Sequence, residues 1–398
     1  MAGDSPLSMM RPAPRRSPRA TAPRRPLRRC LIIAAIIIVV AIGWCGSWYF
    51  AAGIADRAER GWIEREAELG RVYACGSQSI GGFPFSIVSR CVGAAATFSG
   101  NKPPFDVRAA GVTFSAQVFR PTLLNGEIQG PVTLANPGES PIFTANWTNA
   151  RLTLLGLPSE PERVAVSLDK PRLDRLTPPG AGMIFQADTV SFDGSIVQGS
   201  AHSNPVIEAV GHFTGATAPT THPLLAQPLQ GDIDAVMRGF KDFAPKPWPV
   251  LFREMQAAGG GIDIRSVRIE RPDAIIVGNG TLTVNEQGKL DGQIDVAVAG
   301  IDNIVPLLDL DQVIGQSIDR FTGGSGSAAA GLGALDQLVP GLSGVVRQGA
   351  SAGLISNIKK MGKPTEIDKK PAITLPLRVG DGVIYLGVIP IGALPALF

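Results

Sequence analysis

The sequence has few of the residues on which enzymes and metal sites depend. Among 398 residues there are four cysteines and only three histidines, His202, His212 and His222. The histidines are ten residues apart and do not share a helix face, whereas a zinc site needs three or four converging ligands. The chain also lacks the H-E-x-x-H and Walker sequences. We therefore expect no catalytic site, no metal site and no cofactor.

Charged residues are also scarce, at 18% of the chain, and they are unevenly placed. Residues 1–50 carry eight arginines and one acid, so the net charge of +3 leaves −4 for residues 51–398. A protein that binds nucleic acid normally has a basic face. We expect no nucleic-acid partner.

Residues 30–50 contain no charged side chain at all. A helix rises ~1.5 Å per residue, so about twenty apolar residues cross a hydrocarbon core of roughly 30 Å. No second apolar run in the chain approaches that length. The run therefore predicts a single transmembrane helix.

The residues around this run predict its orientation. The arginines, which extend from Arg11 to Arg29, precede the run, and Trp44, Trp48 and Tyr49 close it. Basic flanks stay in the cytoplasm, and Trp and Tyr settle at membrane interfaces. We expect an inner-membrane protein with a cytoplasmic N-terminus and a periplasmic domain. A cleavable signal peptide is the alternative, although its apolar core usually has only ~7–15 residues.

Export would decide the state of the cysteines. Cys30 and Cys45 lie in the apolar run, and Cys75 and Cys91 are the only two beyond it. An oxidising compartment would pair Cys75 with Cys91. The alternative is a pair of buried free thiols.

These features divide the chain into four parts. We expect a disordered, arginine- and proline-rich cytoplasmic tail over residues 1–29, a transmembrane helix over 30–50, a helical stalk over 51–70 and a periplasmic domain over 71–398. The prolines of the tail oppose helix formation. In the stalk, Ala55, Ala58 and Trp62 recur at helical spacing, and Gly70 suits a helix end.

The periplasmic part predicts a β-dominated α+β fold. Alternating segments such as residues 112–118 and 164–168 are separated by turn signals such as Pro178-Pro179-Gly180. This favours a long antiparallel meander, either a curved sheet or a sandwich. Hairpins are expected over residues 281–298 and around Asp381-Gly382.

A few helices are expected to pack on this sheet. Residues 249–258 begin with a proline and precede three glycines, which are start and stop signals for a helix. Helical spacing returns over residues 302–321 and 328–361. Residues 274–277 and 384–389 are apolar on both faces, so the sheet would need helices, a second sheet or a ligand to cover it.

The segment Gly81-Gly82-Phe83-Pro84-Phe85 precedes the first clear strands. Its glycines let the backbone turn, and Pro84 holds Phe83 extended. Phe83 and Phe85 alternate, so both rings are expected on one face of a strand. They are candidates for the lining of an apolar groove, and the alternative is that they fill the first layer of the sheet core.

Several segments match the pattern of a known family. They are residues 48–53, Trp62, residues 80–85 with Cys91, Leu375-Pro376-Leu377, Asp381-Gly382, Tyr385-Leu386-Gly387 and residues 390–395. In these the chain resembles the alphaproteobacterial domain-of-unknown-function family numbered twenty-one twenty-five, single-pass envelope proteins with a GGFPF motif. The hairpin over residues 278–292 is similar to repeats of AsmA-like envelope proteins that handle lipids. The first resemblance implies a cell-envelope protein and no reaction.

Two functions fit these observations. The first is binding of a lipid or acyl chain in an apolar groove lined by Phe83, Phe85 and inward-facing strand residues. The second is a structural or assembly role, in which an exposed sheet edge docks other envelope proteins. The expected partners are the bilayer together with a lipid or with envelope proteins.

Overall fold

The computed structural model describes residues 25–157, 159–243, 246–304, 359–387 and 389–398. The chain divides into two compact units, Met1–Gly53 and Ile54–Phe398. The described part of the first unit belongs to one helix, α1 (Arg25–Glu68). Its apolar side chains between Leu31 and Ile42 are exposed, and it is long and apolar enough to cross a membrane. α1 is therefore suited to anchoring the chain in a membrane.

The ends of α1 follow local chemistry. The helix begins ahead of the apolar run, with Pro26 in its first turn, where a missing amide hydrogen costs nothing. It ends at Glu68, and Gly70 follows with a φ of 77°, a conformation that glycine adopts readily. The predicted tail and stalk boundaries thus fall within or beside one continuous helix, and residues 1–24 lie outside the described residues.

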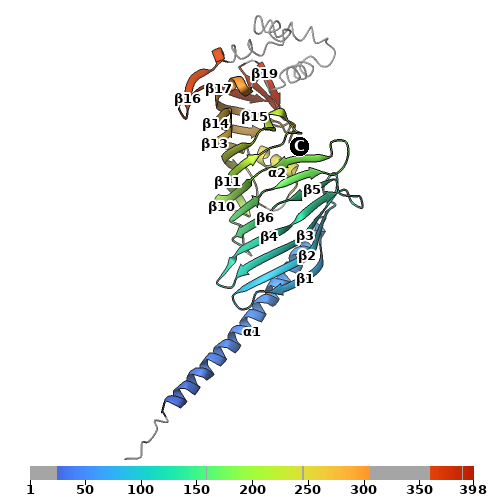
Figure 1. Ribbon diagram of the computed structural model, residues 1–398, viewed down its shortest axis with the longest axis vertical. Helices are drawn as coiled ribbons and strands as arrows, with labels where there is room; N and C mark the ends of the chain where they lie inside the picture. Colours follow the sequence, from blue (N-terminus) through green and yellow to red (C-terminus); the bar gives the residue numbers. More distant parts are fainter. Residues whose placement is uncertain (1–24, 158, 244–245, 305–358, 388) are drawn as a thin grey trace, which may run out of the picture. The chain divides into compact units, whose positions relative to one another are not determined.

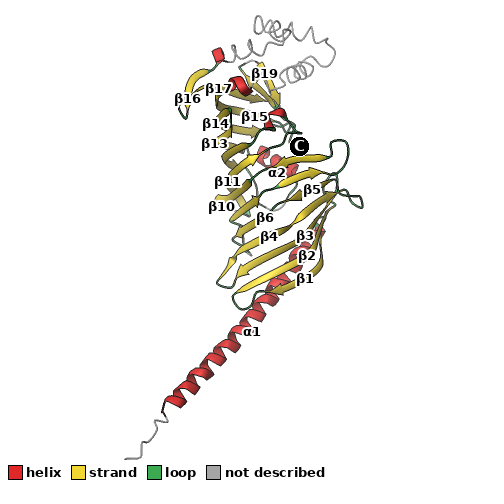
Figure 2. Ribbon diagram, in the orientation of Figure 1, coloured by secondary structure: helices red, strands yellow, loops and turns green. Residues whose placement is uncertain are grey.

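The second unit is dominated by one large antiparallel sheet that is not closed (Figures 1 and 2). Its first strands are β1 (Arg71–Gly81), β2 (Ser86–Phe98), β3 (Phe105–Gln117), β4 (Arg120–Ala135), β5 (Phe143–Asn146), β6 (Asn149–Leu155), β7 (Arg163–Asp169), β8 (Arg172–Arg175), β9 (Gly182–Gln186) and β10 (Thr189–Ser200). The later strands are β11 (Ser203–Ala216), β12 (Leu229–Arg238), β13 (Gly261–Arg271), β14 (Ala274–Val284), β15 (Leu290–Ala299), β16 (Lys363–Ile367), β17 (Lys370–Gly380), β18 (Val383–Leu386) and β19 (Ile389–Ala393). The predicted β-dominated α+β fold is confirmed.

Strands pair with their neighbours in the sequence, as a meander requires. The pairing runs in order from β1 to β4 and from β10 to β15. β15 then pairs with β17, which also pairs with β16 and β18, and β19 closes the series. The expected hairpins β14–β15 and β17–β18 are both present, and Asp381 and Gly382 form the second turn with positive φ.

After β4 the meander continues with three long strands that bend in the middle. Each consists of two named halves: β5 with β6, β7 with β8, and β9 with β10. β5 and β6 both pair with β4. β7 pairs with β6 and β10, while β8 pairs with β5 and β9. The bends lie side by side, because the Lys170 amide donates to the Asp188 carbonyl at 2.8 Å and the Ala187 amide donates to the Pro171 carbonyl at 3.0 Å. Pro171 cannot donate to a ladder, so a bend at this point costs the sheet little.

Apart from α1, the helical elements that the structure describes are short. α2 (Trp248–Ala257) confirms the helix expected over residues 249–258, and it presents the fully buried Met255 to the sheet. The others are the 3₁₀ turn η1 (Pro223–Leu225) and α3 (Ile301–Ile304). The helices expected over residues 302–321 and 328–361 lie almost entirely outside the described residues.

One local prediction is wrong. Residues 82–85 form the turn between β1 and β2, so Phe83 and Phe85 do not alternate along a strand. Gly82 has a φ of 98°, and the Ser86 amide donates to its carbonyl at 3.0 Å, which closes the hairpin. Pro84 has no amide hydrogen for a ladder, and this favours the turn over the strand.

Candidate functional site

A single row of directly paired side chains crosses the sheet on one face. Its members, one from each successive strand, are Ile80, Ser89, Phe114, Gly126, Leu152, Val166, Phe192, Gly211, Ile233, Val267, Gly278, Val296 and Leu375. Cross-strand partners point to the same side of a sheet, so these residues share a face. Apart from Ser89, every member is apolar or glycine. We call this set the apolar row.

The opposite face of the same strands is polar. On the strands from β4 to β13, the sequence neighbours of the apolar-row residues also pair directly across the strands. They are Glu127, Arg151, Ser167, Ser191, His212, Asp232 and Arg268. We call this set the polar row. Ion pairs run beside it, for example between Arg163 Nε and Asp193 Oδ2 at 2.8 Å. The apolar row is therefore built by alternation, with the charged side chains on the other side.

Aromatic rings lie across several glycines on the apolar face. A Cβ added to Gly126 would lie 3.0 Å from the Phe114 ring, and one added to Gly231 would lie 2.6 Å from the Phe213 ring. Rings that lie flat over glycine cover strand backbone that would otherwise face water.

The row is open at its centre. A Cβ added to Gly211 would meet nothing within 4 Å. The two side chains paired with Gly211, Phe192 and Ile233, are 44% and 40% exposed. Large apolar side chains in the middle of an apolar sheet face are normally covered. We call Phe192, Gly211 and Ile233 the central opening.

Buried clusters border the central opening on both sides. On one side α2 packs against the sheet, and the cluster holds Ile207, Phe240, Met255 and Val284. On the other side the segment that contains Leu225 covers Val190, Phe213 and Ile269 around buried Leu229. Ile207 and Phe213 are six residues apart on β11, about 20 Å at ~3.3 Å per residue. The opening thus lies between two buried clusters.

The last part of α1 covers the first strands of the same sheet. The Ser89 hydroxyl donates to a Glu59 carboxylate oxygen at 2.9 Å, and the rings of Trp62 and Tyr73 lie 4.8 Å apart. Burial raises the pKa of the Tyr73 phenol. Because Ser89 belongs to the apolar row, α1 packs over the beginning of that row.

A family model described as an uncharacterized protein conserved in bacteria, DUF2125, matches residues 48–395. The chain belongs to the DUF2125 family. No curated protein and no solved structure matches the chain. The resemblance to this family that the sequence indicated is therefore confirmed, and the match covers nearly all of the sheet unit.

In this DUF2125 chain the polar row brings together three residue types found in hydrolases. Ser191, His212 and Asp232 are paired on β10, β11 and β12, and His212 Nδ1 lies 2.7 Å from Asp232 Oδ1. A hollow of about 300 Å³ lies beside them. Both partners of the pair are largely exposed, and the described residues show no hydrogen bond from Ser191 to His212. The arrangement fits a solvated hydrogen-bonded pair on an open surface.

Two of the residue groups singled out in the sequence have structural roles in this DUF2125 chain. Cys75 and Cys91 form the predicted disulfide between β1 and β2. Gly81, Gly82 and Pro84 shape the first hairpin, as Asp381 and Gly382 shape the last. Among the described residues, no group of three or more His, Cys, Asp or Glu side chains is placed to hold a metal ion.

The proposed groove residues are not part of the central opening. Phe83 and Phe85 lie in the β1–β2 turn, whereas the opening lies on β10 to β12. The sequence reasoning missed Phe192, Gly211 and Ile233. Alternation in each strand was visible, but the register that aligns the three residues depends on turn and bulge positions.

Proposed function

We propose that this protein is a non-catalytic protein of the cell envelope, held in the inner membrane by α1, whose apolar row binds acyl chains of lipids. The N-terminus lies in the cytoplasm and the sheet lies in the periplasm. The observation that carries the proposal is the central opening, where Phe192 and Ile233 stand exposed beside an uncovered Gly211.

The charge distribution supports this topology. Eight arginines and one acid precede the apolar run, and cytoplasmic flanks carry such an excess of basic residues. The Cys75–Cys91 disulfide suits an oxidising compartment. A reporter that is active only in the periplasm, fused after Phe398, is expected to be active. Activity only when the reporter precedes Arg11 would contradict the topology.

Burial energetics favour an acyl chain at the opening. Each buried methylene group contributes ~0.8 kcal/mol, and the exposed side chains of Phe192 and Ile233 would lose contact with water at the same time. The covered margins leave a strip across the strands, which suits a long, thin apolar ligand. Exposed apolar surface of this kind marks ligand or partner sites in soluble domains.

The test uses a matched pair of variants in the full-length protein. Ile233→Glu places a charge in the central opening, and Val210→Glu places one on the opposite face of the neighbouring strand. The two positions are similarly exposed, at 40% and 44%. We expect native mass spectrometry to find co-purifying lipid in the wild type and in Val210→Glu, and little in Ile233→Glu. Equal lipid in both variants, or none in the wild type, would refute acyl-chain binding.

Docking through a sheet edge is the second candidate, and it rests on the sheet being open. Within the described strands β1 pairs only with β2, so its outer edge is available for strand addition. A photo-crosslinker in β1 that captures an envelope protein, together with lipid-free wild-type protein, would favour this role.

A further inference from the structure

Three exposed phenylalanines gather on two neighbouring hairpin tips at the start of the sheet. Phe83, Phe85 and Phe119 are 51%, 62% and 70% exposed. The tips adjoin each other, because the Val118 amide donates to the Phe85 carbonyl at 3.0 Å. The Phe85 and Phe119 rings lie 6.4 Å apart. A cluster of exposed aromatic rings on loops is costly in water and marks a contact surface.

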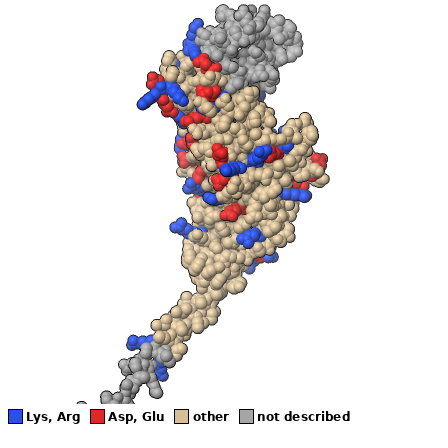
Figure 3. Space-filling view, viewed as in Figure 1, with Lys and Arg blue, Asp and Glu red and all other residues tan. Residues whose placement is uncertain are grey.

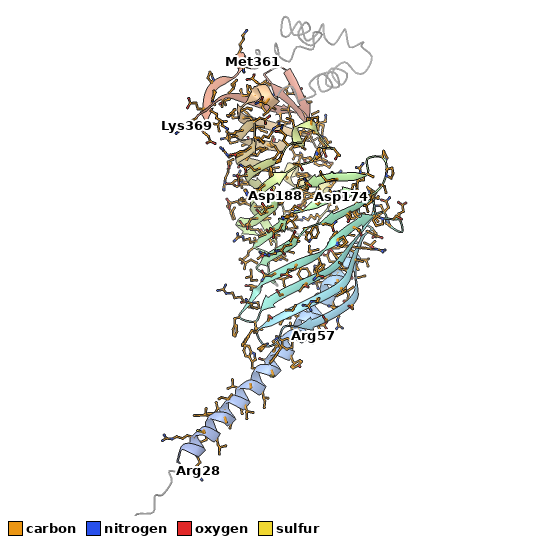
Figure 4. All side chains as sticks on the ribbon, viewed as in Figure 1. Arg28, Arg57, Asp174, Asp188, Met361 and Lys369 are labelled. Carbon is orange, nitrogen blue, oxygen red and sulfur yellow. A yellow bond between two sulfur atoms is a disulfide. The ribbon has the colours of Figure 1, made fainter. Side chains whose placement is uncertain are left out.

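These tips lie at the end of the sheet unit that joins the anchor. Ser89, only four residues after Phe85, is hydrogen-bonded to Glu59, five residues after the unit begins at Ile54. At ~1.5 Å per helical residue, Glu59 is about 8 Å along α1 from Ile54. Only Ala51, Ala52 and Gly53 separate Ile54 from the apolar run. Figure 4 labels Arg57, on the part of α1 that meets the first strands. Chain connectivity alone therefore brings this end of the sheet close to the bilayer.

The charge of the same region suits a lipid surface. Residues 69–126 contain five basic residues and one acid, whereas residues 127–398 contain 21 basic and 27 acidic residues. On the visible face in Figure 3, few charged side chains lie over the lowest strands, and more gather higher on the sheet. Arg120 directly follows Phe119 at the second tip, and it is exposed. Basic residues near a membrane are attracted to anionic headgroups, and aromatic side chains enter the interface.

We propose that the tips formed by residues 82–85 and 118–120 insert into the interface of the bilayer that holds α1. Phe83, Phe85 and Phe119 enter the headgroup region, and Arg120 contacts anionic lipid headgroups. This second attachment fixes the start of the apolar row against the membrane surface. It rests on the proposed membrane anchoring, and it does not depend on lipid binding at the central opening.

The experiment places the photo-crosslinking amino acid p-benzoylphenylalanine at single positions of the full-length protein. The protein is reconstituted into vesicles of phosphatidylethanolamine and phosphatidylglycerol, irradiated and examined by mass spectrometry. We expect phospholipid adducts at positions 85 and 119, several-fold above those at position 210. Val210 is the control because it is exposed on the polar face, away from both lipid sites.

A fourth position, Phe192, separates this proposal from the acyl-chain site. Adducts at 192 without adducts at 85 and 119 would overturn the tip proposal and leave the central opening as the lipid site. Adducts at 85 and 119 without adducts at 192 would support the tips alone. Crosslinks from 85 or 119 to a second copy of the chain in place of lipid would overturn the proposal in favour of self-association.

The role of Arg120 is tested by Arg120→Glu with the crosslinker at position 119. We expect a several-fold lower adduct yield than in the Arg120 protein when the vesicles contain phosphatidylglycerol, and no such difference in phosphatidylcholine vesicles. The same yield from both proteins in phosphatidylglycerol vesicles would overturn the headgroup contact.

Discussion

The two faces of the strands from β6 to β13 share one backbone but differ in how their side chains are covered and paired. On the polar face, side chains satisfy one another, as Gln230, Arg268 and Glu270 do across β12 and β13. On the apolar face, the row is covered at its margins and left open at Phe192, Gly211 and Ile233. The polar face presents mainly charged and hydrogen-bonded side chains to water, whereas the apolar face lacks cover at its centre.

The proposed function rests on this difference and not on any single residue type. Antiparallel sheets usually bury one face and leave the other to water, so an exposed stretch in the buried face needs an explanation. The covering elements, α2 on one side and the Leu225 segment on the other, stop short of the centre. The acyl chain that we propose to bind there would supply the missing layer.

The largest expected effect comes from placing a charge on each face of one strand. Ile207 is 5% exposed in the cluster beneath α2, and Val210 lies on the polar face of the same strand. Ile207→Asp buries an unpaired carboxylate and should lower the free energy of unfolding by more than ~4 kcal/mol. Val210→Asp should change it by less than ~0.5 kcal/mol. Chemical unfolding of both full-length variants in detergent measures this, and similar losses would mean that the faces are wrongly assigned.

Much of this two-faced organisation was predictable from the sequence, because alternation is a local property. The meander, the helix before Gly259, the last hairpin and the Cys75–Cys91 pair all followed from residue patterns. The segment at Phe83 misled because its alternation fits a strand, while Pro84 and a positive φ at Gly82 make a turn. Only the three-dimensional pairing shows which glycine is covered by a ring and which is open.

The disulfide joins β1 and β2, the strands against which the end of α1 packs. Removing it therefore tests how much this covered end of the apolar face contributes to stability. Cys75 and Cys91 are separated by 16 positions. Replacing Cys75 by Ser should lower the free energy of unfolding by ~2–5 kcal/mol, because the unfolded chain regains loop entropy. Thiol labelling of unfolded, unreduced wild type should modify only Cys30 and Cys45. Labelling of four thiols would show that the bond is absent from the purified protein.

Glycine substitutions sharpen the comparison within the apolar face itself. Gly231→Ala would bring a Cβ to 2.6 Å from the Phe213 ring and 2.9 Å from the Arg268 carbonyl oxygen. Such overpacking should cost ~1–3 kcal/mol. At Gly211 the added Cβ meets nothing, so Gly211→Ala should be neutral or stabilise the fold by up to ~1 kcal/mol through a less flexible unfolded chain. Equal destabilisation by both substitutions would mean that the centre of the row is covered.

The smallest expected effect concerns the polar face and its pH dependence. A hydrogen bond from Gln230 Nε2, at 2.6 Å, and the neighbouring Arg268 hold the pKa of Glu270 below its ordinary value of 4.5. A carboxylate with a lowered folded-state pKa stabilises the fold above its unfolded-state pKa, and this stabilisation is lost as the pH falls through the folded-state value. Wild type should therefore exceed Glu270→Gln in unfolding free energy at neutral pH by no more than ~1 kcal/mol, as expected of a surface pair. Unfolding curves recorded from neutral pH to well below 4.5 should converge for the two proteins. A difference that persists at the acid end would show that Glu270 acts through packing and not through its charge.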